Sequence, residues 1–252
     1  MSIEKAEIEC RFRRSVESYE ENAHIQKKIV KHLVELLEHY CPKEINHILE
    51  IGCGTGLLSE QLKSMWSHSE LWLNDLVDDM CTKAANRCGI EAQYCLPGDI
   101  ENVQLEEMYS LIVSTSTFQW FEHPSETFRH LAEHIVPGGW LVFSSFGEDN
   151  CRELKAITGN GLTYRSLAEM QELLSCYFEV LHTEEEMYTL NFDHPLNILQ
   201  HIKKTGVNAM SSHKTWTRGR LDAFVQEYAL RFLKDGHYPL TYHPQYFICR
   251  KL

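Results

Sequence analysis

A glycine-rich segment preceded by an acidic residue carries the clearest chemical signal in this sequence. Residues 52–56 read Gly-Cys-Gly-Thr-Gly, follow a run typical of a buried strand and precede a helical pattern that starts at Leu57. Backbone N–H groups in such a turn, together with the helix N-terminus, face the space above a sheet. The alternative is a plain turn between a strand and a helix. The residues expected to face a ligand are Gly52, Cys53, Gly54 and Gly56.

The spacing of these glycines does not suit a dinucleotide. The fingerprint G-x-G-x-x-G requires glycine at position 57, where the chain has Leu57. Glu50, inside the strand before the turn, would disfavour a pyrophosphate but suits a ligand with an ammonium or sulfonium group. A cationic ligand is therefore favoured, and a nicotinamide-dependent oxidoreductase is the least favoured class of enzyme.

Two more acidic residues stand where a nucleoside would need them. Asp75 ends the second expected strand, about 20 residues beyond the turn as in other ribose-binding sheets, so its oxygens can accept both ribose hydroxyls. Asp99 follows the third strand and can accept from an adenine amino group while Ile100 packs on the ring. Either aspartate could instead cap a helix. Further residues expected at the ligand are Leu76, Met80, Ser114 and Thr115.

Strands and helices alternate along the chain. Strands are expected at residues 47–51, 70–74, 92–96, 110–114, 140–145, 178–192 and 242–251, and helices at 20–40, 57–66, 78–88, 124–135, 166–176, 195–206 and 217–234. Residues 137–139, Pro-Gly-Gly, are expected to form a turn. This order predicts an α/β fold with a doubly wound, seven-stranded, mostly parallel sheet, and a ligand site at the carboxyl ends of its strands.

A chain of 252 residues is expected to form one domain with accessory parts. We expect an N-terminal helical cap at residues 1–42, a ligand-binding core at 43–193, an inserted helical lid at 194–240 and a terminal strand at 241–252.

The composition of the chain limits which classes of binding partner and which cellular compartment are expected. The formal net charge of −12 makes nucleic acid an unlikely partner, because proteins that grip its backbone present a basic surface. No apolar run is long enough for a membrane helix and residues 1–10 lack the apolar block of a signal peptide, so a cytoplasmic location is expected. The nine cysteines are scattered singly and are read as reduced thiols, and no pattern of metal-ligand spacing is present. A monomer with no metal is expected.

The segment at residues 49–56, Leu-Glu-Ile-Gly-Cys-Gly-Thr-Gly, resembles motif I of class I methyltransferases. That resemblance implies S-adenosylmethionine (SAM) as cofactor and S-adenosylhomocysteine as product. Methyltransferases of base or amide nitrogens usually carry Asn/Asp-Pro-Pro-Tyr/Phe after the fourth strand, whereas residues 114–120 here read Ser-Thr-Ser-Thr-Phe-Gln-Trp. A carboxylate or another oxygen nucleophile is therefore favoured.

Further segments are similar to the malonyl-acyl-carrier-protein O-methyltransferases of biotin synthesis. They lie at residues 12–26, 98–101, 118–120, 202–209 and 238–243. The resemblance implies methylation of the free carboxylate of malonyl thioester on acyl carrier protein. Thr55, where relatives often have proline, departs from the pattern.

Roles for several residues follow from this interpretation. Tyr19 and Gln26 are expected to close the N-terminal helix over SAM, and Phe118, Gln119 and Trp120 to line the pocket for methyl transfer. Phe12, Tyr19, Ala23 and Gln26 are expected on one helical face, where a packing stripe is the alternative. Arg13 or Arg14 could bind a carboxylate of SAM or malonate.

The lid offers a basic surface for an acidic carrier protein, since no acidic side chain occurs between Asp193 and Asp222. A solvated helix face is the alternative. The basic residues expected to bind the carrier are Lys203, Lys204, Lys214, Arg218 and Arg220.

Two rival functions stay open at this point. One is a methyltransferase acting on small carboxylic acids, which would share the core but need no docking lid. The other is a SAM-binding protein without catalysis that acts through its lid as a partner module.

Overall fold

A seven-stranded sheet forms the centre of the computed structural model, which describes residues 5–15, 19–159, 161–205 and 216–252, without the side chains of Ser15 and Tyr19. In spatial order the strands are β3 (Cys95–Pro97), β2 (Glu70–Asp75), β1 (His47–Ile51), β4 (Tyr109–Ser114), β5 (Ile135–Phe146), β9 (Pro244–Lys251) and β6 (Phe178–Glu185). The first five run parallel, and β9 is antiparallel to both β5 and β6. The predicted doubly wound, mostly parallel sheet is confirmed.

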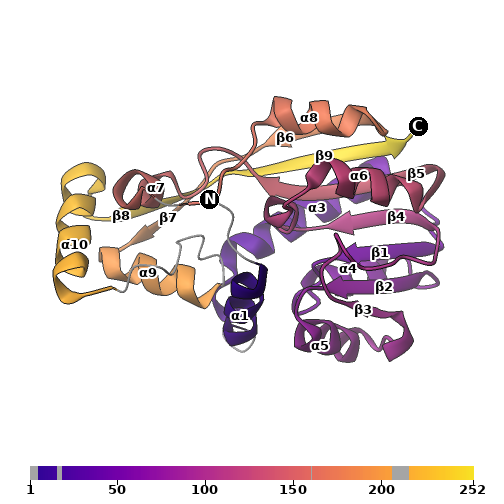
Figure 1. The fold of residues 1–252 in the computed structure, drawn as a ribbon, viewed down its shortest axis with the longest axis horizontal. Coiled ribbons are helices and arrows are strands. Elements are labelled where there is room, and N and C mark those ends of the chain that lie inside the picture. Colours follow the sequence, from indigo (N-terminus) through magenta and orange to yellow (C-terminus); the bar gives the residue numbers. More distant parts are fainter. Residues whose placement is uncertain (1–4, 16–18, 160, 206–215) are drawn as a thin grey trace.

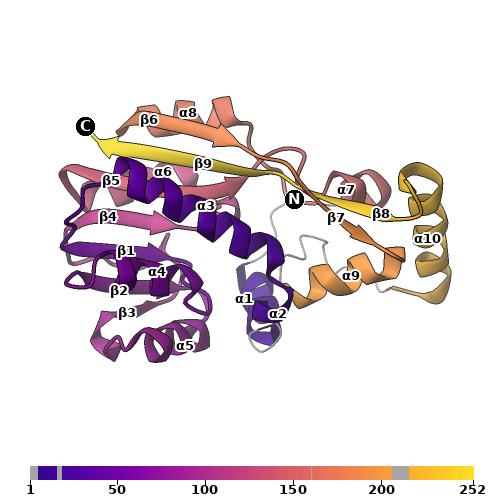
Figure 2. The same ribbon diagram turned by 180° about the vertical axis from the view of Figure 1, so that it is seen from behind.

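Helices cover both faces of the sheet (Figures 1 and 2). One face carries α3 (His24–Tyr40), α4 (Leu57–Met65) and α5 (Asp78–Cys88). The other carries α6 (Pro124–Glu133) and α8 (Leu167–Ser175). Because the strands are covered on both sides, they can consist of nearly continuous apolar runs, as in β4.

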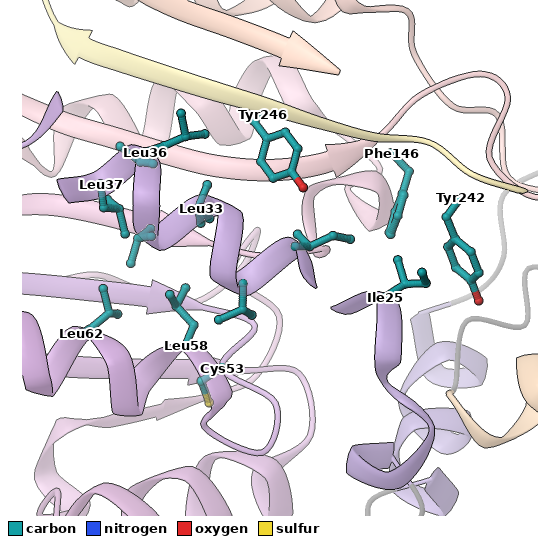
Figure 3. Packing of buried hydrophobic residues seen from close by; sticks show 14 of the residues in the cluster. Ile25, Leu33, Leu36, Leu37, Cys53, Leu58, Leu62, Phe146, Tyr242 and Tyr246 are labelled. Atoms are coloured by element: carbon teal, nitrogen blue, oxygen red, sulfur yellow. The ribbon is translucent and has the colours of Figure 1, made fainter. Parts of the chain in front are cut away.

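Helix α3 shows how sequence periodicity builds the first of these layers. Its apolar residues recur every three or four positions, so they form one buried stripe, while the opposite face carries Lys and Glu. Figure 3 shows Leu33, Leu36 and Leu37 of this stripe in the same cluster as Leu58 and Leu62 of α4. This packing fixes α4, and with it the turn that precedes α4, against the sheet.

A second, two-stranded sheet lies beyond the carboxyl end of β5 and organises the lid. It pairs β7 (Tyr188–Phe192) with β8 (Tyr238–Tyr242), and it is accompanied by α7 (Arg152–Thr158), α9 (Pro195–Lys204) and α10 (Arg218–Phe232). The buried carboxylate of Glu153 on α7 accepts hydrogen bonds from Thr241 N (3.0 Å) and Thr241 Oγ1 (2.5 Å). Only His243 separates β8 from β9, so the lid continues directly into the central sheet (Figure 1).

Two short N-terminal helices lie between the core and the lid (Figure 2). They are α1 (Lys5–Ser15) and α2 (Tyr19–Asn22), and both contact α9 of the lid.

Several predicted boundaries were wrong. The expected helix at residues 20–40 is α2 and α3, separated at Ala23, and the expected strand at 178–192 is two strands in different sheets. Residues 92–94 form a short 3-10 turn before β3. Residues 137–139 lie within β5, where the pairing with β4 shifts register, and not in a turn between elements. The terminal strand divides into β8 and β9, and α7 was not predicted.

None of the helices within the described ranges is both long and apolar enough to cross a bilayer.

Candidate active site

A cavity opens at the carboxyl ends of the parallel strands, between the sheet and α1. The empty space inside it, its opening to solvent included, is about 760 Å³. The core lines it with Ile51, Gly52, Gly54, Asn74, Asp75, Leu76, Met80, Gly98, Asp99, Ile100, Thr115, Ser116, Thr117, Trp120 and Phe121, and α1 with Lys5, Ile8 and Phe12.

The glycine turn forms the floor of this cavity. Gly52 has a φ of 70°, and a Cβ atom at this position would lie 2.0 Å from Thr117 Oγ1, so only glycine fits. Cys53 N donates to Asn74 O at 2.9 Å and ties the turn to β2. Gly56, with a φ of 87°, begins α4 where a Cβ atom would meet Ala84 Cα at 3.1 Å. Gly56 therefore serves the close packing of α4 on α5.

Asp75 is held at the end of β2 by two backbone donors. Its Oδ2 accepts from Gly54 N and its Oδ1 from Val77 N, both at 2.9 Å. Burial raises the pKa of this carboxyl to about 6, although both hydrogen bonds act to lower it. Each oxygen keeps a lone pair for a ligand hydroxyl. Val77 occupies the N-cap position of α5, so Asp75 is not the N-cap residue of that helix.

Asn74 fixes the loop that carries Asp99. Its buried Nδ2 donates to Leu96 O (2.7 Å) and Gly98 O (3.0 Å), which holds the loop against the end of β2. Asp99 Oδ1 accepts from Glu101 N at 3.1 Å, and Oδ2 accepts from Asn102 Nδ2 at 2.9 Å. Asp99 thus faces the cavity in a turn of fixed shape.

Helix α1 covers the cavity from the opposite side. Lys5 Nζ forms ion pairs with Asp99, at 2.5 Å from Oδ2, and with Glu101. The ring of Phe12 meets the Trp120 ring edge-on, with 5.9 Å between centroids. Two contacts, one polar and one aromatic, therefore place α1 over the site.

The segment after β4 turns sharply at Ser116, which has a φ of 55°. Ser116 N donates to Ser144 O at 3.2 Å, and Gln119 Nε2 donates to Ser116 O at 2.5 Å. The Phe118 ring stacks on Phe143, with 4.3 Å between centroids, in the core under α6. Phe118 is therefore not part of the cavity lining that was predicted for it, because the short helical turn at 118–120 directs it into the sheet and leaves Trp120 at the surface of the cavity.

Glu50 lies behind the turn and not in the cavity. Its buried carboxyl accepts from Ser59 Oγ of α4 at 2.5 Å, and burial raises its pKa to about 8. Burial therefore favours the neutral form of Glu50, and the carboxyl does not line the cavity, although the sequence interpretation expected it to. The structure instead gives Glu50 a role in joining β1 to α4.

Comparison with known proteins identifies the family. A family model described as "Methyltransferase domain" matches residues 21–204. The malonyl-[acyl-carrier protein] O-methyltransferase of Acinetobacter baylyi is 37% identical over 100% of this chain and 98% of that protein. The enzyme of the same name from Bacteroides thetaiotaomicron is 34% identical over 99% of each chain. The chain belongs to the malonyl-[acyl-carrier protein] O-methyltransferase family.

A third relative is longer than this member of the family. The malonyl-[acyl-carrier protein] O-methyltransferase of Bacteroides fragilis is 38% identical over 97% of this chain, but the chain spans about half the length of that protein, 50%.

Solved structures agree on the fold. The N-methyltransferase NodS from Bradyrhizobium japonicum, in complex with S-adenosylhomocysteine, has a TM-score of 0.54 at 16% identity over 88% of this chain and 85% of that one. The plantazolicin methyltransferase BpumL, also in complex with S-adenosylhomocysteine, has a TM-score of 0.53 at 15% identity over 95% of this chain and 90% of that one.

The methyltransferase cavity gathers most of the predicted ligand residues. Those that line it are Gly52, Gly54, Asp75, Leu76, Met80, Asp99, Ile100, Thr115 and Trp120. Other predicted residues stand behind it: Cys53 is buried with its Sγ 3.9 Å from Cys81 Sγ, and Ser114 Oγ donates to Ile51 O at 2.7 Å. Buried Gln26 lies on α3 and Phe12 on α1, so the single helical face predicted for them does not exist. Tyr19 is the first residue of α2, and its side chain is not among the parts of the chain that the structure describes.

Sequence reasoning missed the residues that α1 contributes, Lys5 and Ile8. Lys5 and Ile8 lie seven and four positions before Phe12, and this helical spacing could have identified them. Asn74 was not predicted either. Its side-chain amide donates hydrogen bonds to the backbone of the loop that carries Asp99.

The predicted basic residues of the lid are placed at the end of α9 and the start of α10. Lys203 and Lys204 are exposed in the last turn of α9, and Arg218 and Arg220 are exposed in the first turn of α10. Lys214 lies outside the described residues.

Proposed function

We propose that this enzyme transfers a methyl group from SAM to the free carboxylate of a malonyl group held as a thioester on acyl carrier protein. The products are the malonyl methyl ester and S-adenosylhomocysteine. The observation that carries this assignment is the 34–38% identity, over nearly the whole chain, to relatives named for that reaction.

The residues of the cavity fit SAM. Asp75 offers its carboxylate to ribose hydroxyls, Asp99 offers an acceptor to the adenine amino group, and Ile100 offers an apolar surface to the ring. The backbone of Gly52, Gly54 and Thr115 borders the space left for the methionine part. When bound, SAM supplies a methyl group on a cationic sulfur, which is a strong electrophile.

The substrate needs no general base, because a carboxyl group with an ordinary pKa of about 4 is already ionised at neutral pH. What the protein must supply is alignment of the carboxylate oxygen with the methyl group and exclusion of water. We assign Trp120, with Gln119 and Phe12, to this end of the cavity, and Tyr19 and Gln26 to closing the N-terminal helices. Phe118 packs in the core on Phe143.

The carrier protein is acidic, whereas this enzyme has a net charge of −12. Docking therefore needs a local basic surface, for which Lys203, Lys204, Lys214, Arg218 and Arg220 are our candidates. The methyl ester removes a charge that would be costly in the apolar tunnels of fatty-acid synthesis. This accounts for why a malonyl group would be capped before chain elongation in biotin synthesis.

We further infer that the chain acts as a monomer in the cytoplasm, as one methyltransferase domain with an inserted lid. Neither nucleic acid nor a membrane is required for the reaction.

A comparison of substrates tests the proposed function. Methyl transfer from labelled SAM should be fast with malonyl-carrier protein and slow with malonyl-CoA and with free dicarboxylic acids. Equal rates on free dicarboxylic acids would favour a small-molecule methyltransferase. No transfer to any of them, despite binding of S-adenosylhomocysteine, would favour a non-catalytic partner protein.

The assigned pocket residues have a separate test. Tyr19→Phe and Gln119→Ala should each lower kcat/KM for malonyl-carrier protein by about tenfold, the effect of losing one aligned contact. If both variants keep the wild-type kcat/KM, these two residues do not act in the reaction.

A further inference from the structure

Lys5 is bound by two carboxylates at the edge of the cavity. Its Nζ lies 2.5 Å from Asp99 Oδ2 and also contacts a carboxylate oxygen of Glu101. Burial alone would lower the pKa of Lys5, but hydrogen bonds and charges of both carboxylates outweigh it and raise the pKa. Lys5 is therefore a cation, and it sits on the acceptor that we assign to the adenine amino group.

The two partners of Lys5 are not equivalent. Glu101 has a side chain that is only 7% exposed, and it accepts from Glu122 N (2.9 Å), His123 N (2.8 Å) and Thr127 Oγ1 (2.8 Å). These bonds hold Glu101 at the start of α6, and its pKa is lowered by them and by Lys5 despite its burial. Glu101 is a fixed anchor, whereas Asp99 lines the cavity and is open to a ligand.

Lys5 is one of the contacts that place α1 over the cavity. Lys5, Ile8 and Phe12 share one helical face, and all three line the cavity. In addition, Glu20 of α2 pairs with Arg87 of α5 at 2.7 Å. The N-terminal helices are thus joined to the core by two ion pairs, an inner one at Lys5 and a more exposed, outer one at Glu20.

We propose that Lys5 is a positioning residue that holds α1 over the adenosine end of the cofactor, with Glu101 as its permanent partner and Asp99 as a partner that it yields to the adenine amino group. This rests on SAM as the cofactor and is independent of the methyl acceptor. Because Glu101 keeps Lys5 in place, binding of the cofactor exchanges one hydrogen bond without releasing α1.

Lys5→Met tests this, since it removes the charge but keeps most of the apolar side chain. We expect calorimetry to show about tenfold weaker binding of S-adenosylhomocysteine, because one charge-assisted contact is lost. Stopped-flow measurements should show faster dissociation. Lys5→Arg should restore most of the affinity. Lys31→Met, the same change at an exposed position of α3, should bind as the wild type does. Glu20→Gln, which loosens only the outer ion pair, should have a smaller effect than Lys5→Met.

Limited trypsin digestion gives a second readout that is independent of activity. Arg13 and Arg14 are exposed on α1, and saturating S-adenosylhomocysteine should protect them from cleavage in the wild type but much less in Lys5→Met. If Lys5→Met does not fold, Lys5→Gln carries the same expectations. Unchanged or tighter binding by the variant, with wild-type protection, would overturn the proposal. If the wild type itself does not bind S-adenosylhomocysteine, the proposed function fails instead.

Discussion

At the scale of residues, the acids of this site divide by what surrounds them. Asp75 and Asp99 keep lone pairs open to the cavity, whereas Glu50 is enclosed between β1 and α4 with one hydroxyl donor. A buried carboxyl with a single neutral donor is more stable protonated than ionised. Three acids that look alike in the sequence therefore lie in two different environments.

Glu50→Gln should change how stability depends on pH. Glu50 has a pKa of about 8 in the folded protein against an ordinary value of 4.5, so the unfolded chain loses this proton first as the pH rises. The wild type should lose stability between pH 4.5 and about 8, by an amount on the order of a few kcal/mol. In urea unfolding at several pH values, Glu50→Gln should show a smaller decline, confined to the range between pH 3.8 and about 6 in which Asp75 also loses its proton later in the folded protein than in the unfolded chain.

The control for that measurement is Glu44→Gln at an exposed site, which should follow the wild type. Parallel curves for the wild type and Glu50→Gln would show that Glu50 is ionised in the folded protein.

Gly52→Ala should abolish binding of S-adenosylhomocysteine, because the new methyl group would meet Thr117 Oγ1 and must displace the segment after β4. Gly89→Ala is a matched control: Gly89 has a similar φ of 64°, but nothing lies within 4 Å of the added Cβ atom. Both variants should lose about 1 kcal/mol of stability because alanine, unlike glycine, is strained in the left-handed backbone conformation. Calorimetry that finds near-wild-type affinity in Gly52→Ala would contradict the role given to this turn.

At the scale of elements, α1 connects the cavity to α9 of the lid. Helix α1 lines the cavity, and it contacts α9, whose last turn carries Lys203 and Lys204. The sequence predicted α9 and a strand on each side of the lid, but not that β7 and β8 would pair with each other in a sheet of their own. The break in the expected strand at 178–192 lies at residues 186–187, where β6 leaves the central sheet for β7, and no glycine or proline marks that exchange.

Charge reversal on α9 tests the docking surface. Lys203→Glu combined with Lys204→Glu should raise KM for malonyl-carrier protein by about tenfold, with little change in kcat. The reason is that the end of α9 would then be negative and would repel the acidic carrier. Affinity for S-adenosylhomocysteine should stay the same. The control combines Lys31→Glu on α3 with Lys43→Glu just after that helix. It changes the net charge by the same amount and should leave KM near the wild-type value. An equal loss on a small malonyl thioester would show that α9 does not act by docking.

At the scale of the whole molecule, the sheet was predictable, but the contacts that hold the cover of its site were not. Alternating apolar runs and helical periodicity in residues 43–146 reflect burial on both faces, which is a local property of each segment. The cover depends on contacts over long sequence separations, such as Lys5 with Asp99 or Glu153 with Thr241. Neither pair follows from spacing along the chain, and the same holds for Phe118, whose burial depends on Phe143.

The most direct test of the account is mass spectrometry of malonyl-loaded acyl carrier protein after incubation with the enzyme and SAM. We predict that the carrier gains the mass of one methyl group in place of a hydrogen, and that mild alkaline hydrolysis of the ester removes it. A carrier of unchanged mass, with SAM bound to the enzyme and not consumed, would contradict the central claim that this site methylates a carrier-bound carboxylate.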